Sequence, residues 1–273
     1  MIREITFGQY YPVDSPIHRL DPRIKLFGTL IYIISLFIAN NIAGYLIAVI
    51  FLGIIIGISK VPLKFILKGL RPIIFILLFS VTFNVFLTTG EHVLFSWGIF
   101  VVSVEGIIRA AHMAVRLVML IIGSSLMTYT TTPNQLTDGL EKSLGFLKKI
   151  NVPVHEMAMM MSIALRFIPI LIEETDKIMK AQMARGADFD TGNIIQKVKS
   201  MITLLIPLFV SAFRRASDLA MAMEARCYNG GEGRTKMKPL VYAKEDIAGY
   251  VVVFVYLGVI ILTAVLLKNA LPF

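Results

Sequence analysis

The stretch LFGTLIYIISLFIANNIAGYLIAVIFLGIIIGIS covers residues 26–59 and contains no charged side chain. A helix needs about 20 mostly apolar residues to cross about 30 Å of hydrocarbon. The stretch is therefore too long for one membrane-spanning helix and just long enough for two. Asn40, Asn41 and Gly44 interrupt it, and residues of these types favour a turn. We predict two spans, at about 24–40 and 42–59.

The composition of the whole chain indicates the same class of protein. Of its 273 residues, 56% are hydrophobic and 16% are charged, and the mean hydropathy is +0.76. Ordinary soluble domains carry about 45–50% apolar and about 25% charged residues. The net charge of +9 fits the basic cytoplasmic loops of a membrane protein, so no nucleic-acid partner is expected. The single cysteine, Cys227, excludes an internal disulfide and a cysteine-based zinc site. We expect an all-α, multi-pass membrane protein.

Three further apolar segments bring the predicted number of spans to five, at about 73–89, 110–131 and 247–267. Segment 60–71 carries four basic residues and has Pro62 and Pro72 near its ends, which predicts a short basic helix at the cytoplasmic surface. The apolar run 93–104 is too short for a crossing. Its Phe, Trp and Val residues favour a short extracellular strand or a re-entrant piece.

The positive charges predict the orientation in the cell membrane. Arg3, Arg19, Arg23 and Lys25 precede the first span, whereas the turn at Asn40 has no basic residue. Basic loops stay in the cytoplasm, so we expect the N-terminus inside and the C-terminus outside. We divide the chain into an N-terminal segment with four spans (1–133), a cytoplasmic helical domain (134–246) and the last span (247–273).

The predicted cytoplasmic domain consists of three helices. The first starts at Pro133 and runs to Lys149, and the second opens at Pro153 and shows apolar residues at helical spacing. Asn193 is a candidate cap for the third. The charge-free part of the third helix, 200–213, contains Pro207 and is too short to span the bilayer. We therefore expect both long helices to lie along the membrane surface or each other with one face free.

The second and third of these helices end alike, in Ala184-Arg185-Gly186 and Ala225-Arg226-Cys227. Small residues leave room for a partner, and an arginine at a helix end offers a planar fork for carboxylates. The alternative is that each arginine only complements the helix dipole. Gly186 can end the first of these helices, and we expect residues 229–231, Asn-Gly-Gly, to end the other.

Recognisable catalytic motifs are missing from the sequence. It contains no phosphate-binding loop, and its four histidines lack metal-binding spacing. Glu105 and Arg109 are one turn apart and can pair, with Arg116 on the same face. Such charges within a membrane point to function or lock helices together. Two alternatives stay open: a membrane-embedded enzyme using Glu105 and His112, and a self-sufficient secondary transporter with broken helices.

Two compositional features concern helix packing. Gly53 and Gly57 form a GxxxG pattern in the second span, which favours close approach of a neighbouring helix. Nine of the 14 methionines lie between Met157 and Met223. Methionine suits surfaces that accept more than one partner, although it also fills helical cores.

Four groups of residues together resemble one family, the transmembrane T component of energy-coupling factor (ECF) transporters, known as the CbiQ/EcfT family. The first is the segment SPIHRLDPRIK at 15–25. The second is Thr131-Thr132-Pro133 with Leu136 and Leu140. The third is LRFIP at 165–169, and the fourth is the pair of Ala-Arg-small helix ends. The family usually has Gly or Ser where this chain has Cys227. The form of the first segment is more similar to shared scaffolds than to dedicated cobalt or biotin transporters.

The resemblance implies a five-span, L-shaped, non-catalytic subunit with cytoplasmic coupling helices. Its partners would be two ABC-type ATPases, which alone bind ATP, and interchangeable substrate-binding S components for vitamin or micronutrient uptake. No cofactor or metal is expected in the chain itself. The resemblance assigns ATPase docking to Ala184, Arg185, Gly186, Ala225, Arg226 and Cys227. The expected S-component and coupling surface comprises Met157, Met161, Leu165, Met179, Met183, Phe209 and Met223.

Overall fold

The computed structural model describes residues 10–39, 41–87, 92–97, 100–187, 189, 194–231, 237 and 239–266. The chain divides into two compact units. The first, here called the bundle unit, comprises the described residues up to 140 and from 240 onward. The second, here called the two-helix unit, comprises those between 141 and 239. The domain boundaries predicted above rest on membrane topology and stay a prediction.

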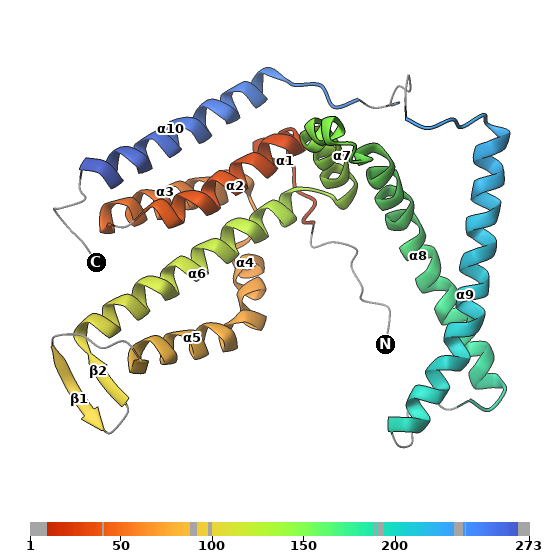
Figure 1. Ribbon diagram of the computed structural model, residues 1–273, viewed down its shortest axis with the longest axis horizontal. Helices are drawn as coiled ribbons and strands as arrows, with labels where there is room; N and C mark the ends of the chain where they lie inside the picture. Colours follow the sequence, from red (N-terminus) through yellow and green to blue (C-terminus); the bar gives the residue numbers. More distant parts are fainter. Residues whose placement is uncertain are drawn as a thin grey trace. The chain divides into compact units, whose positions relative to one another are not determined.

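The bundle unit consists of helices with one small β-hairpin (Figure 1). Helices α2, α3, α6 and α10 pack together, α4 and α5 pack against α6, and strands β1 and β2 pair antiparallel. The elements are α1 (Pro16–Arg19), α2 (Pro22–Ile38), α3 (Ile42–Ser59), α4 (Leu63–Leu70), the 3₁₀ turn η1 (Arg71–Ile73), α5 (Ile74–Leu87), β1 (Val93–Trp97), β2 (Phe100–Ser103), α6 (Val104–Thr130), the start of α7 (Pro133–Ser143) and α10 (Lys244–Leu266).

The core of the bundle unit is an aromatic stack between α2, α3 and α10. The rings of Phe51 and Tyr256 lie 4.0 Å apart between centroids, and Tyr32 stacks on Tyr256 at 6.2 Å. The Tyr256 hydroxyl also shares a 2.6 Å hydrogen bond with Oγ of Ser35. Since both polar groups are buried, their pairing removes the cost of two unsatisfied groups in an apolar environment.

The outer surface of the bundle unit is apolar, as expected for helices in lipid. Side chains such as Phe75 (76% exposed) and Leu266 (71%) face outward. Among the described residues, six helical segments are long and apolar enough to cross a membrane: 42–59, 63–86, 104–130, 154–184, 198–225 and 244–266. Helix α2, which corresponds to the first predicted span, has 17 residues and is therefore about 26 Å long. The prediction of an all-α membrane protein is confirmed. Whether α8 and α9 lie outside the bilayer stays a prediction.

Several helix boundaries differ from the predicted spans because polar caps extend the helices beyond their apolar parts. Helix α6 starts at Val104 rather than near 110, since Oγ of Ser103 accepts from the Gly106 N–H at 3.0 Å. Helix α10 starts at Lys244 rather than 247, since Oδ2 of Asp246 accepts from the Ala243 N–H at 2.6 Å. Residues 93–97 and 100–103 form two antiparallel strands, which agrees with the strand expected in the run 93–104. Arg3, Asn40 and residues 88–91 lie outside the described residues.

Asp21, just before α2, joins the start of α2 to the start of α10. Asp21 caps α2 and pairs with Arg23 at 2.8 Å, and its N–H donates to Oδ1 of Asp246 at 2.8 Å. Burial opposes the ionisation of Asp21, but the hydrogen bonds and charge of Arg23 outweigh it and lower the pKa of Asp21. A contact between residues 225 positions apart thus joins α2 to α10.

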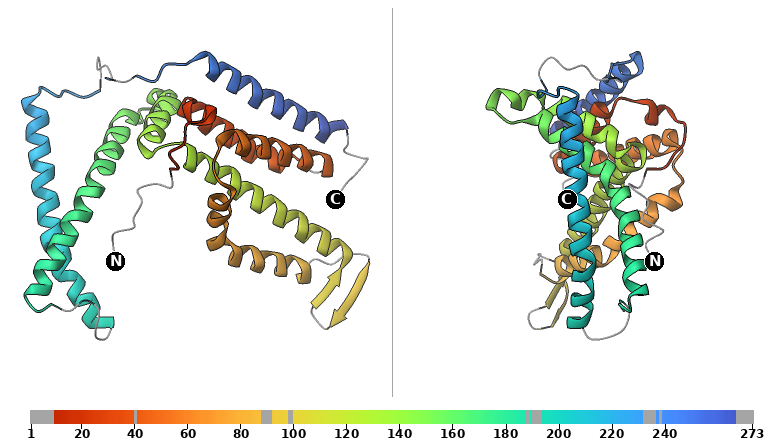
Figure 2. Two further views of the ribbon diagram at one scale, coloured as in Figure 1. Left: turned by 180° about the vertical axis from the view of Figure 1, so that it is seen from behind. Right: turned by 90° about the vertical axis from the view of Figure 1, so that its right-hand side faces the viewer.

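The two-helix unit contains two long helices joined by a short connection. After the end of α7 come the 3₁₀ segment η2 (Leu144–Ile150), α8 (Val154–Ala184) and α9 (Ile194–Ala225). The expected helix to Lys149 therefore changes to 3₁₀ geometry after Ser143. Helices α8 and α9 contact each other and run in opposite directions (Figures 1 and 2). Asn193, the expected cap of α9, lies outside the described residues.

Candidate functional site

The end of α8 is closed by a tight hydrogen-bonded turn that includes Arg185. The N–H of Ala187 donates to the carbonyl of Gln182 at 3.0 Å, and the N–H of Gly186 donates to the carbonyl of Met183 at 3.0 Å. Gly186 has φ +88°. This is the Schellman arrangement, in which a left-handed residue stops the helix. Arg185 is the last residue before that stop, and its side chain is exposed.

The end of α9 repeats the same arrangement residue by residue. The N–H of Tyr228 donates to the carbonyl of Met223 at 3.0 Å, and the N–H of Cys227 donates to the carbonyl of Glu224 at 2.9 Å. Cys227 has φ +55° and occupies the position that Gly186 holds in α8. The expectation that residues 229–231 end this helix is wrong, because Cys227 itself adopts the left-handed conformation. Arg226 is thus the positional equivalent of Arg185.

All six residues of the two ends are exposed to solvent. Between the ends, α8 and α9 are joined by an ion pair in which Nη2 of Arg215 lies 3.2 Å from Oε2 of Glu174. Arg185 follows Glu174 by eleven positions, and Arg226 follows Arg215 by eleven, which is about 16 Å of helix in each case. Because the helices run in opposite directions, the two arginines lie at opposite ends of the pair (Figure 1).

Two further contacts, which sequence reasoning missed, meet at His155 near the start of α8. One comes from Glu141 of α7, and the other comes from the segment after α9. Nδ1 of His155 lies 2.9 Å from Oε1 of Glu141, with both side chains largely buried. Gly231 lies so close that a Cβ atom added to it would overlap the His155 ring. Since only five positions separate Gly231 from Arg226, this contact also restrains the end of α9. No local signal in the sequence indicates it.

The residues predicted to form a coupling surface divide into two groups by exposure. Met157, Met161, Met183 and Phe209 are between 46% and 65% exposed. Leu165, Met179 and Met223 are half-buried. The exposed members form part of a broad apolar surface on α8 and α9. This surface includes a shallow groove along one face of α9. This groove is lined by Phe209, Val210, Phe213, Arg214, Ser217 and Asp218.

The candidate charges of α6 have separate partners and do not form one site. Oε1 of Glu105 accepts from the His92 N–H at 3.3 Å. A Glu105–Arg109 ion pair, which the spacing allows, is not among those formed by the described residues. Nε of Arg116 donates to the Tyr45 hydroxyl at 2.6 Å, which ties α6 to α3. The described residues contain no cluster of three metal-ligating side chains.

The SPIHRLDPRIK segment has a structural role within the bundle unit. Oγ of Ser15 lies 2.7 Å from Nδ1 of His18, whose Nε2 lies 3.1 Å from the Tyr11 carbonyl. These partners fit a neutral ring with the proton on Nε2, and burial lowers the pKa of His18. The buried Lys25 donates to the carbonyls of His18 and Thr130 at 3.0 and 2.8 Å. Its ammonium thus caps α6, where a cation complements the helix dipole.

Comparison with known proteins gives consistent matches along the chain. The model of a family described as CbiQ, cobalt transport protein, matches residues 14–237. A protein of Clostridium kluyveri named energy-coupling factor transporter transmembrane protein EcfT is 58% identical over 247 residues, which cover 90% of this chain and 92% of the relative. Proteins of the same name from Ruminiclostridium cellulolyticum (56% over 256 residues; 93% and 96%) and Bacillus subtilis (48% over 246; 90% and 93%) also match.

Proposed function

Because the chain belongs to the CbiQ/EcfT family of energy-coupling factor transporter transmembrane proteins, we propose that it is the coupling subunit of such an importer. In this role it connects two ABC-type ATPases to a membrane-embedded S component that binds a vitamin or another micronutrient. The observation that carries the proposal is the pair of matching helix ends with Arg185 and Arg226. The chain itself is proposed to hold no cofactor, and ATP binds only to the partner subunits.

The matching ends support docking to two similar partners. Two ATPase subunits of the same fold present similar surfaces, and Arg185 and Arg226 stand at the same position of the same hydrogen-bonded turn. Their exposed guanidinium groups can pair bidentately with carboxylates on each ATPase. The small neighbours Ala184, Gly186 and Ala225 leave room for close approach. Cys227 is also small, so the turn after Arg226 remains open to a partner.

The contacts within the two-helix unit support the transmission of motion. Helices α8 and α9 are joined at Glu174 and Arg215, and the arginines lie at opposite ends of the pair. When ATP binding closes the two ATPases, their approach moves the helix ends and changes the angle between α8 and α9. Long helices transmit such a change because their backbone hydrogen bonds keep them stiff over many turns.

The apolar surface of α8 and α9 supports contact with the S component. Exposed Met157, Met161, Met183 and Phe209 offer unbranched or planar side chains, and methionine adapts to partners of different shape. One coupling subunit can therefore serve several S components, and the choice of substrate resides in them. The positive charges favour a cytoplasmic N-terminus and a cytoplasmic two-helix unit.

Charge reversal at both helix ends tests the docking role. The double variant Arg185→Glu, Arg226→Glu is coexpressed with the two ATPases and an S component of the same organism. We expect the ATPases to be lost from the purified complex, because removing one partner of a buried interfacial charge pair costs about 2–5 kcal/mol. Undiminished copurification would contradict the proposal.

The matched control reverses the same number of charges on the same two helices at residues outside the two Ala-Arg-small turns. Lys177 on α8 and Lys199 on α9 are both exposed, and Lys177→Glu, Lys199→Glu should leave the complex intact. Gel filtration of both double variants checks that each is folded. Loss of the ATPases from the control variant as well would show that general electrostatic attraction, rather than the helix ends, holds the complex together.

A further inference from the structure

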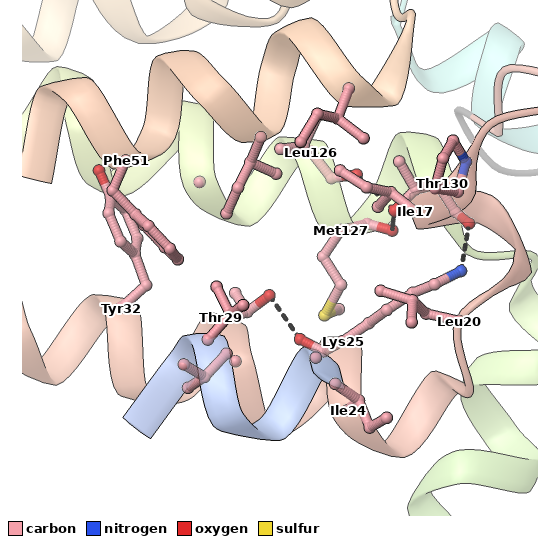
Figure 3. A pocket seen from close by; sticks show the side chains of 18 of the residues that line it. Ile17, Leu20, Ile24, Lys25, Thr29, Tyr32, Phe51, Leu126, Met127 and Thr130 are labelled. Carbon is pink, nitrogen blue, oxygen red and sulfur yellow. Dashed lines mark hydrogen bonds between the residues drawn. The ribbon is translucent and has the colours of Figure 1, made fainter. Parts of the chain in front are cut away.

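The bundle unit contains a cavity of about 500 Å³ between α2, α3, α6 and α10 (Figure 3). Cavities that hold small molecules measure about 300–1,000 Å³. Its wall is formed by the first half of α2 and α10 and the last half of α3 and α6, with α1 at one end. The side chains around it include Leu20, Ile24, Phe51, Leu126 and Met127. All of them belong to the end of the bundle at which the basic N-terminal segment lies.

Three polar side chains of the wall are hydrogen-bonded to the backbone of the protein. The Lys25 ammonium donates to two backbone carbonyls. Oγ1 of Thr29 donates to the Lys25 carbonyl at 2.7 Å, and Oγ1 of Thr130 donates to the Leu126 carbonyl at 2.9 Å. Glu245 and Tyr32, whose hydroxyl has no hydrogen-bond partner among the described residues, also line the cavity, but most of its wall is apolar. A polar ligand would lose its hydrogen bonds to water on entering, whereas a hydrocarbon would lose none.

We propose that this cavity binds one acyl chain of a phospholipid from the cytoplasmic leaflet. The cavity extends from Leu20, just before the charge-free stretch, to Phe51 within the second span. This is the course of a lipid tail whose headgroup remains at the membrane surface. A tail gains no hydrophobic energy by leaving the bilayer. Inside the cavity, however, the tail gains van der Waals contacts with the side chains of the wall.

The charges near the cavity indicate that the tail, not the headgroup, provides the binding. Arg19 pairs with Asp14 at 2.6 Å and Arg23 with Asp21 at 2.8 Å, so both arginines already have a carboxylate. The Lys25 ammonium is held by two carbonyls and is buried. An anionic headgroup therefore finds no uncompensated cation among these residues. We expect binding without preference for anionic lipids.

Two neighbouring isoleucines of α3 provide a matched test. Ile55 lines the cavity, whereas Ile54 is 55% exposed and does not. The full chain is purified in detergent, washed free of bulk lipid and analysed by native mass spectrometry with lipid extraction. Wild type and Ile54→Trp should each retain one phospholipid per chain. Ile55→Trp should retain only the background amount, because the larger indole obstructs the path of the tail.

A second variant and a lipid series complete the test. Ala248→Trp obstructs the cavity from α10 and should lose the lipid too, which covers the case that Ile55→Trp does not fold. Re-addition of phosphatidylethanolamine, phosphatidylglycerol or phosphatidylcholine with the same tails should restore binding equally. Absence of retained lipid in wild type, or equal retention in all folded variants, would overturn the proposal. Retention of phosphatidylglycerol alone would overturn the assignment to the tail.

Discussion

Single glycines decide how closely the helices of the bundle unit approach. A Cβ atom added to Gly123 would lie 2.6 Å from Cε1 of Tyr32, so α6 packs against α2 without a side chain at this position. The GxxxG pattern of Gly53 and Gly57 suggested close packing of α3 instead. Within the described chain no other helix approaches them, since nothing beyond their own stretch of α3 lies within 4 Å of a Cβ added to either glycine. Spacing alone does not identify the glycine that a neighbour approaches.

We predict opposite outcomes for the same substitution at two of these glycines. Gly123→Ala should lower the stability by about 1–3 kcal/mol, because the added methyl group overpacks the contact with Tyr32. Gly53→Ala should leave the stability unchanged or raise it by up to about 1 kcal/mol, since alanine favours a helix. Thermal unfolding of both variants in the same detergent measures this. Equal destabilisation by the two substitutions would show that the α2–α6 contact is described wrongly.

At the scale of helices, α8 and α9 end in the same hydrogen-bonded turn but have different residues at its left-handed position. Gly186 adopts its left-handed conformation at no steric cost, whereas Cys227 adopts it against a penalty of about 1 kcal/mol. The hydrogen bonds of the Schellman turn and the contact of Gly231 with His155 hold Cys227 in place. The ion pair between Glu174 and Arg215 joins α8 and α9 between these two ends.

A charge exchange tests whether this ion pair positions the two helix ends. Glu174→Arg and Arg215→Glu should each reduce the amount of ATPase that copurifies, and the double exchange should restore it. The side chains are partly exposed, so the pair contributes only about 1 kcal/mol or less to stability. Thermal unfolding should therefore change little in the single variants. If the double variant copurifies no better than the single ones, the pair does not set the position of the ends.

At the scale of the whole molecule, the proposed function requires the two-helix unit to lie on the cytoplasmic side. Cys227 can report on which side of the membrane this unit lies. It is the only cysteine of the chain, and it is exposed next to Arg226. A membrane-impermeant maleimide should label Cys227 in inside-out vesicles and leave it unlabelled in right-side-out vesicles. Bound ATPases should protect it, since the docking surface includes this residue. Labelling from the outside would contradict both the topology and the docking role.

The sequence by itself determined the class of protein, the main helices and the paired arginine ends. In lipid a polypeptide must satisfy its backbone hydrogen bonds internally, so few structures can span the membrane. The length and apolarity of a segment therefore nearly suffice to identify a spanning helix. Only the tertiary structure decided which distant residues meet, such as Asp21 with Asp246 and Gly231 with His155. It also decided that Cys227, rather than the Asn-Gly-Gly that follows, ends α9. Such contacts depend on how close two helices come, and no local pattern in either helix encodes that distance.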